Sequence, residues 1–219
     1  MRANNARIRA VDRCRANPRE IDDLLWHRGL LRRHAAIRAE WRAFAHEGGR
    51  LVPVDEPGRH AGVLVVNGRP APGATDGFPR TRDALASVPG LCRATWVELE
   101  PGYAFARRVD PNAGTLRYAL TVVGNADCGL RVAGNEIAGR ERTGVLFDAT
   151  AEHGAWNHGV RSWVVLACEV LRPLPWASRG LNRAVQRLLA LGERADQLPR
   201  PMPAFCSTSA DTPSSRHDA

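Results

Sequence analysis

The segment from Phe147 to Asn157, FDATAEHGAWN, contains His153, which could bind a metal, and Arg161 follows at the head of an apolar run. A neutral imidazole is a common metal ligand, and a guanidinium binds a carboxylate bidentately without losing its charge. His153 and Arg161 therefore predict a metal ligand followed by a carboxylate anchor. A hydrogen-bonded core histidine and an arginine on a solvated strand face are the alternatives.

A second segment with chemical potential, residues 108–118 (RVDPNAGTLRY), lies upstream of the first. Asp110 could supply a metal carboxylate, or it could start a turn before Pro111 by capping the backbone. Arg117 could bind a carboxylate or lie on a solvated face. Arg108 and Asp110 are two residues apart, so on a strand they share one face and could form an ion pair.

Together with Cys128–Val132 (CGLRV), these two segments resemble the aspartyl/asparaginyl β-hydroxylase family of iron(II)- and 2-oxoglutarate-dependent dioxygenases. The resemblance covers residues 34–175, and its strongest block, from Leu99 to Arg161, preserves the order and spacing of the family motifs. It implies an α+β chain with a double-stranded β-helix core (jelly roll, cupin-like). It also implies hydroxylation of an unactivated C–H bond, on the β-carbon of an Asp/Asn-type residue or on a related small or acyl substrate.

The resemblance implies a metal site as well. The family holds iron(II) with a His-x-Asp pair near one strand and a lone histidine several strands later. The matching positions here are Arg108, Asp110 and His153. Asp110 and His153 are the predicted iron ligands, and Arg108 replaces the first histidine. A guanidinium about 4 Å from a divalent cation would cost roughly 8 kcal/mol at an effective dielectric constant of about 20. Either an Arg108–Asp110 ion pair replaces the metal, or two residues hold iron with water or substrate completing its shell.

For the cosubstrate, the resemblance implies that Arg161 anchors the distal carboxylate of 2-oxoglutarate and that Arg117 is a second binding arginine. Ala119 stands where many family members carry a histidine. No catalytic residue is expected beyond the metal site. The competing function is a binding protein on the same fold, in which Arg108, Arg117 and Arg161 form a cationic pocket for a carboxylate ligand without turnover.

The elements that must position these residues are mainly strands. Apolar runs of β type recur about every ten residues between Cys92 and Val170, and such spacing predicts a sandwich or barrel with its core over residues 92–171. The expected strands are Thr95–Leu99, Tyr103–Arg107, Leu116–Val123, Leu130–Val132, Val145–Phe147 and Trp163–Val170. A further short strand is expected at Val63–Val66.

Helices are expected on either side of the strands. Two helical patterns lie between Pro18 and Gly48 and should pack against a sheet, and a short helix should span Phe78–Val88. A C-terminal amphipathic helix is expected over residues 178–191, with an apolar face made of Leu181, Val185, Leu188 and Leu189. We expect that face to cover the sheet; an anionic membrane surface is the alternative, because arginines follow one side of the same helix.

The 219 residues fit one domain, predicted over residues 18–197, with disordered segments at 1–17 and 198–219. The net charge of +8 comes from 31 basic residues that are all arginine and are spread along the chain. Without a nucleic-acid-binding motif beside them, no nucleic-acid partner is expected. Five widely spaced cysteines and no apolar run of about 20 residues predict a cytoplasmic protein without a transmembrane segment.

Overall fold

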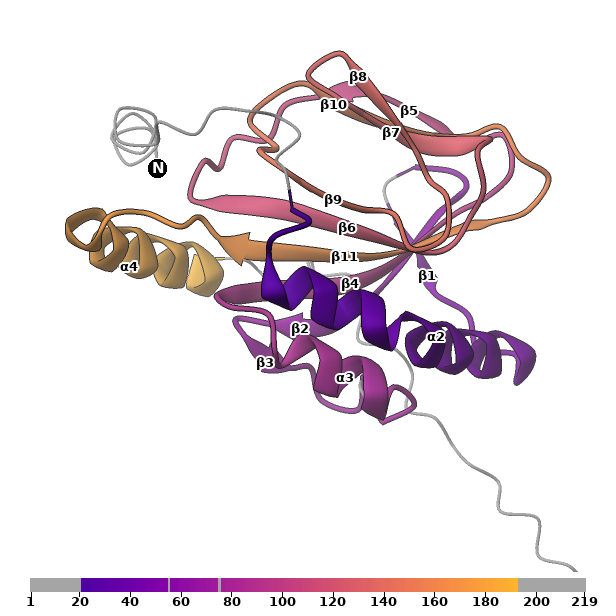
Figure 1. The fold of residues 1–219 in the computed structure, drawn as a ribbon, viewed down its shortest axis with the longest axis horizontal. Coiled ribbons are helices and arrows are strands. Elements are labelled where there is room, and N and C mark those ends of the chain that lie inside the picture. The colour runs from indigo at the N-terminus through magenta and orange to yellow at the C-terminus, as the bar shows by residue number, and fades with distance from the viewer. Residues whose placement is uncertain (1–20, 55, 75, 193–219) are drawn as a thin grey trace, which may run out of the picture.

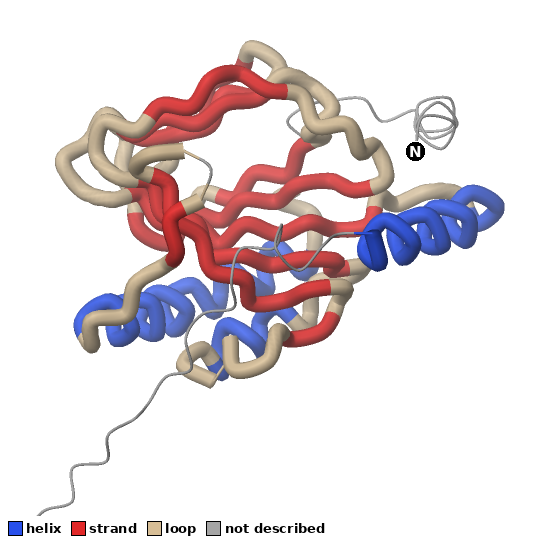
Figure 2. Tube along the Cα trace, turned by 180° about the vertical axis from the view of Figure 1, so that it is seen from behind, coloured by secondary structure: helices blue, strands red, loops and turns tan. Residues whose placement is uncertain are grey.

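Two antiparallel sheets face each other in the computed structural model, which describes residues 21–54, 56–74 and 76–192 (Figures 1 and 2). The larger sheet has the strand order β1-β2-β4-β11-β6-β9, and β3 pairs with β2. Its strands are β1 (Val52–Pro53), β2 (Arg59–Val66), β3 (Arg69–Pro70), β4 (Leu91–Leu99), β6 (Thr115–Val123), β9 (Gly144–Phe147) and β11 (Trp163–Leu171).

The smaller sheet has the order β5-β10-β7-β8. Its strands are β5 (Ala104–Arg108), β7 (Cys128–Val132), β8 (Asn135–Ala138) and β10 (His153–Asn157). The chain passes between the two sheets several times, so residues far apart in sequence face each other across the interior. The architecture is a double-stranded β-helix, or jelly roll, with flanking helices, and the predicted fold is confirmed.

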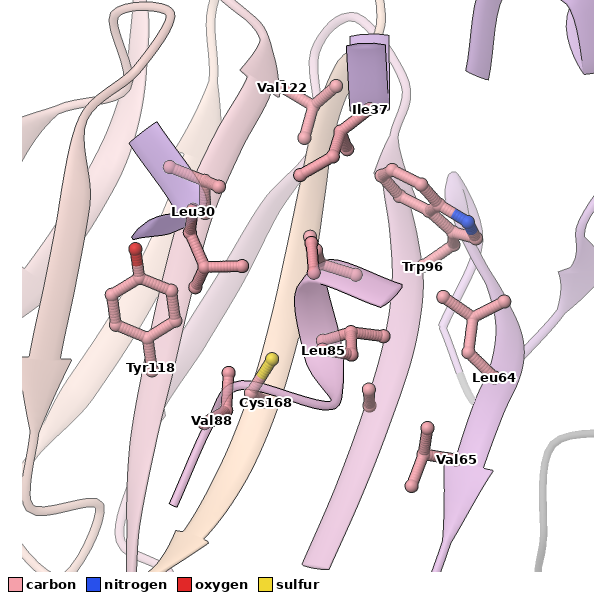
Figure 3. Close-up of a cluster of buried hydrophobic side chains, with 14 of the residues drawn as sticks. Leu30, Ile37, Leu64, Val65, Leu85, Val88, Trp96, Tyr118, Val122 and Cys168 are labelled. Atoms are coloured by element: carbon pink, nitrogen blue, oxygen red, sulfur yellow. The ribbon is translucent and has the colours of Figure 1, made fainter. Parts of the chain in front are cut away.

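Two helices cover the outer face of the larger sheet, α2 (Leu25–His46) and α3 (Pro79–Leu85) (Figure 1). Their buried side chains join those of β4, β6 and β11 in the main core, where Ile37 lies near Trp96 and Val122, and Leu30 lies near Tyr118 (Figure 3). Burying large apolar side chains of this kind contributes about 1.5–3 kcal/mol each. This core fixes the larger sheet, and it leaves the sheet's inner face free to line a cavity.

Several predicted elements differ from those observed. One continuous helix, α2, replaces the two predicted N-terminal helices, because no proline interrupts the sequence and Gly29 is tolerated within the helix. The predicted stop at Gly48 is confirmed: the helix ends at His46, and Gly48 adopts a φ of +81°. Strands β8 and β10 were not predicted, since their sequences NEIA and HGAWN are short and largely without β-branched residues.

The C-terminal helix α4 (Trp176–Gly192) exists as predicted, but its predicted packing is wrong. Of its four predicted apolar-face residues, Val185 and Leu189 are half-buried, but Leu181 and Leu188 are 44% and 68% exposed, whereas the polar Ser178 and Asn182 are buried. Hydrogen bonds from the polar side of the helix to the segment before β6 replace the expected apolar contact with the sheet. None of the described helices is long and apolar enough to cross a membrane. The predictions for residues 1–17 and 198–219 lie outside the described residues.

Candidate functional site

A cavity of about 710 Å³ lies between the inner faces of the two sheets. Strand register gives it two chemically different ends. At the charged end, Glu169 of β11 is the cross-strand partner of both Arg93 and Arg117, and all three line the cavity. His153 and Arg108 face the cavity from the smaller sheet. The charged end therefore combines residues from both sheets.

The other end of the cavity is mostly apolar. Along β11, the inward positions after Glu169 are Ala167, Val165 and Trp163, and they line the cavity with Val97 and Leu99 of β4. At about 3.4 Å per residue, Trp163 lies about 20 Å along the strand from Glu169. Arg59, on the strand β2 beside β4, also lines the cavity, as the register partner of Leu99. The cavity thus pairs a charged end with an extended, mostly apolar wall.

His153 opens strand β10 and is only 3% exposed. Its Nδ1 lies 3.0 Å from the Ala151 carbonyl oxygen, which can only accept, so this contact places the proton on Nδ1. Its Nε2 is buried and has no hydrogen-bond partner among the described residues. Burial lowers the pKa of His153, outweighing the backbone hydrogen bond to Ala151. The ring is therefore neutral near pH 7, and its Nε2 carries an available lone pair.

Arg108 is the cross-strand partner of His153, on β5. Its guanidinium carbon lies 4.6 Å from the centre of the Phe105 ring, and its buried Nε makes no hydrogen bond within the described residues. Burial and the nearby charges of Arg117 and Arg59 lower its pKa, although an arginine remains protonated at neutral pH. Arg108 is consequently a charged donor whose nearest carboxylate, Asp110, lies 3.9 Å from its Nε.

Asp110 is held by arginine. The Arg117 guanidinium is 2.6 Å from Asp110 Oδ2 and 3.7 Å from Glu169 Oε1. The predicted Arg108–Asp110 ion pair also forms, at 3.9 Å, but Arg117 is the closer partner of Asp110. The capping role considered for Asp110 falls instead to Asn112, whose side-chain oxygen accepts the Gly114 N–H at 2.9 Å.

These residues do not fit an iron(II) centre of two histidines and one carboxylate. Within the described residues, no group of three or more His, Cys, Asp or Glu side chains is placed to hold a metal. His153 offers one free nitrogen, but the Asp110 carboxylate is paired with Arg117, and Arg108 occupies the strand position opposite His153. Two guanidinium groups stand where a dication would need anionic or neutral donors.

The structure brings together three of the four predicted site residues, His153, Asp110 and Arg117. Arg161 lies apart from them, exposed in the loop between β10 and β11, and it is not among the residues that line the cavity. Its backbone carbonyl accepts a hydrogen bond from Asn157 at 2.9 Å, which shapes that loop. The carboxylate anchor predicted for Arg161 is not supported by this position.

Sequence reasoning missed Glu169 and Trp163. Glu169 is a charged residue near the end of the apolar strand Trp163–Leu171, and this interruption was the available signal, because an acidic side chain in a buried strand usually has a partner. Trp163 is 2% exposed, and its Nε1 donates to Thr121 Oγ1 at 3.2 Å. That hydrogen bond fixes the indole at the apolar end of the cavity.

Comparisons with known proteins find a family match and a curated relative. The sequence profile described as Aspartyl/Asparaginyl beta-hydroxylase matches residues 32–173, more than half of the chain. A curated relative, the ornithine lipid ester-linked acyl 2-hydroxylase of Rhizobium tropici, is 32% identical over 113 residues. That match covers 50% of this chain and 40% of the relative, so the chain spans less than half of the relative's length.

Solved structures with some likeness include KdgF from Halomonas sp., with 14% identity, a TM-score of 0.39 and coverage of 57% of this chain and 90% of that one. Another is a Cupin_2 domain of an XRE-family transcriptional regulator from Enterobacter cloacae, with 13% identity, a TM-score of 0.38 and coverage of 53% and 99%. The profile match spans both predicted site segments, from Arg108 to His153. The chain therefore belongs to the aspartyl/asparaginyl β-hydroxylase family.

Proposed function

We propose that this protein uses the hydroxylase fold to bind an anionic ligand that carries a carboxylate on an apolar body. Arg108 and Arg117 would bind the carboxylate, and the apolar wall would receive the rest of the ligand. The observation that carries this proposal is the state of Arg108, a charged donor beside His153 on the neighbouring strand, whose buried Nε makes no hydrogen bond within the described residues. Arginine is well suited to the role because it binds carboxylates bidentately.

The balance of charge in the cavity supports an anionic ligand. Arg59, Arg93, Arg108 and Arg117 bring four positive charges to the cavity wall, and Glu169 is the one acidic residue among those that line it. Asp110 adds a second carboxylate behind Arg117. Burial, and then the charges of Arg117 and Arg59, lower the pKa of Arg108, and a bound anion would offset these effects.

Each residue then has a defined task. Asp110 and Glu169 hold the Arg117 guanidinium, so little side-chain freedom is lost when the ligand binds. Phe105 packs against Arg108 and keeps water from one side of its guanidinium. His153 can accept a hydrogen bond from a ligand hydroxyl or amide through Nε2. Ala167, Val165 and Trp163 give an apolar path for the body of the ligand.

An acyl group is the ligand class that matches this wall best. The relative from Rhizobium tropici is an acyl 2-hydroxylase by name, which puts its reaction close to an acyl carbonyl. A cavity of about 710 Å³ falls within the 300–1,000 Å³ of ordinary small-ligand sites. A peptide carrying an acidic residue would leave the apolar end of the cavity without a partner.

A second candidate is hydroxylation with iron(II) and 2-oxoglutarate. Two observations favour it, the unpartnered Nε2 of His153 and membership of a hydroxylase family. When bound, iron would supply the oxidising chemistry. We rank this candidate second because Asp110 is paired with Arg117 and because Arg108 occupies the strand position opposite His153.

The test is calorimetric titration of the full-length protein with octanoate, succinate and 2-oxoglutarate in a buffer containing a chelator. We expect octanoate to bind at one site and Arg108→Gln to weaken that binding by about tenfold, the effect of losing one charged hydrogen bond. Arg161→Gln is the matched control and should leave affinity unchanged. Loss of affinity with Arg161→Gln but not with Arg108→Gln would overturn the assignment. Succinate formation from 2-oxoglutarate after adding iron(II) and oxygen would favour the second candidate.

A further inference from the structure

Helix α4 is attached to the protein through its polar side. Asn182 Nδ2 donates to the Gly114 carbonyl oxygen at 2.9 Å. Gln186 and Asn112 exchange two hydrogen bonds, of 2.9 and 3.1 Å. A surface helix normally buries its apolar stripe. In α4, Val185 and Leu189 are half-buried beside the buried Ser178 and Asn182, but Leu181 and Leu188 are left exposed. Figure 1 shows it beyond the end of β11, whereas α2 and α3 lie across the larger sheet.

The outer side of α4 combines apolar and cationic residues. Leu181 and Leu188 are seven residues, or about two turns, apart, so they lie on one stripe with the exposed Ala184 between them. Arg179, Arg183 and Arg187 are also exposed and follow one another at four-residue intervals beside that stripe. Trp176, at the start of the helix, is 87% exposed. The helix contains no acidic residue.

We infer that this outer side of α4 docks on the surface of an anionic lipid bilayer. Leucine and tryptophan side chains enter the boundary between headgroups and acyl chains, while arginines beside them meet the lipid phosphates. A nucleic acid would pair with the arginines but would gain nothing from the exposed leucines. A second copy of the chain, packed about a twofold axis, would bring two rows of arginines together. The lipid surface is the partner that satisfies both sets of residues.

The test uses the full-length protein and sedimentation with vesicles of phosphatidylcholine, either pure or containing phosphatidylglycerol. Binding is expected only with the anionic vesicles, and it should weaken as salt is raised. Each arginine near an anionic surface contributes roughly a fivefold change in partition coefficient. Replacing Arg179, Arg183 and Arg187 together by glutamine should therefore abolish measurable binding.

Two further variants separate the contributions of charge and apolar contact. Replacing Arg32, Arg42 and Arg50 by glutamine removes the same charge from exposed positions on and just after α2, and it should reduce binding far less. Leu181→Gln with Leu188→Gln keeps every charge and should still weaken binding at least about tenfold. Circular dichroism of each variant checks that the fold is retained.

Three outcomes would overturn the inference. The unaltered protein could fail to sediment with anionic vesicles, or the α2 control could lose as much binding as the α4 triple variant. A dimer that dissociates in the Leu181→Gln, Leu188→Gln variant would show that a second copy occupies this side of the helix. Octanoate binding, measured on the same variants, should stay unchanged, so failure of the membrane inference and failure of the proposed ligand site are distinguishable.

Discussion

Arg108 and His153 are cross-strand partners on β5 and β10, and both side chains line the same cavity. A permanent cation therefore lies beside an imidazole nitrogen that is free to act as a ligand. Arg117 and Asp110 complete the arrangement from the neighbouring segment of chain, at 2.6 Å from each other. Arginine guanidinium groups therefore occupy the position where the family resemblance predicts a metal ion. For this reason we propose that the site binds an anion.

Arg117 should support both the stability of the site and its affinity for ligand. Arg117→Gln would leave the Asp110 and Glu169 carboxylates without their shared cation, and we expect a loss of about 1–2 kcal/mol in the free energy of unfolding. Urea unfolding measures that change. Arg131→Gln is the control, because Arg131 pairs with Glu136 on the exposed side of β7 and should cost less than about 1 kcal/mol. Equal costs for the two variants would contradict the role given to Arg117.

Arg172 should be the more critical arginine for folding. It is 4% exposed, its Nη2 lies 2.5 Å from Asp148 Oδ2, and its Nε donates to the Ala113 carbonyl oxygen at 2.7 Å. Burial alone would raise the pKa of Asp148, but hydrogen bonds from Arg172 and Thr150 outweigh it and hold that pKa below its ordinary value. Asp148 is thus ionised at neutral pH, and the pair is charged.

Breaking this buried pair with Arg172→Gln should cost about 3–5 kcal/mol, since Asp148 would keep its charge and its hydrogen bonds from Thr150 but lose the guanidinium that balances that charge. Thermal unfolding is the measurement. Arg107→Gln, which breaks the exposed Arg107–Glu152 pair of 3.1 Å, is the comparison and should shift the midpoint only slightly. A small effect of Arg172→Gln would show that the protein relaxes around Asp148.

Acid should destabilise the protein below about pH 6.5. Burial lowers the pKa of His27 and of His34, so in the folded state both bind protons only at lower pH than they do in the unfolded chain. As pH falls below 6.5, the unfolded state takes up protons first and the free energy of unfolding declines, by up to about 1.4 kcal/mol per pH unit for each histidine.

Urea unfolding at pH 7.5 and pH 5.5 measures how steeply the free energy of unfolding declines with pH. His34→Asn keeps a polar group near the Thr121 carbonyl oxygen, which His34 contacts through Nε2 at 2.9 Å, but removes the titration. That variant should lose less stability on acidification than the unaltered protein. If His34→Asn and the unaltered protein lost the same free energy of unfolding on acidification, His34 would not remain neutral in the folded state.

The apolar wall should set which ligands fit. Ala167 lines the cavity between Glu169 and Val165, and Ala167→Leu would fill part of the path proposed for an acyl chain. Octanoate affinity should fall by about tenfold, at roughly 0.8 kcal/mol for each methylene displaced from the wall. Succinate affinity should change little. Calorimetry with both ligands measures this, and Ala39→Leu on the exposed side of α2 is the control.

The fold could be predicted from the sequence because apolar strands alternate with turns at regular spacing, and β4, β6, β9 and β11 appear close to their expected positions. Strand β10 could not, since HGAWN has no β-type pattern, and neighbours β5 and β7 supply its pairing. The side of α4 that faces the protein was also misjudged. Hydrogen bonds from Asn182 and Gln186 orient the helix, and the periodicity of apolar residues in the sequence cannot predict such bonds.

The site was predictable to the extent that it lies on regular strands. Asp110, Arg117 and His153 come together because their segments are adjacent in the β-helix. Arg161 was predicted to lie in the site but is exposed in the loop between β10 and β11, because position along the chain does not determine which way a loop residue points. Glu169 was overlooked because an acidic residue in an apolar strand becomes meaningful only when its partners, Arg93 and Arg117, are known from the register.

We propose that Arg108 makes this cavity a site for an anion instead of an iron centre. Anaerobic titration with iron(II) and 2-oxoglutarate, followed by the visible charge-transfer band, tests it most directly when the unaltered protein is compared with Arg108→His. We expect no band in the unaltered protein. We expect a band in Arg108→His, which would place a second imidazole opposite His153. A band of full intensity in the unaltered protein would show that iron(II) and 2-oxoglutarate bind despite Arg108.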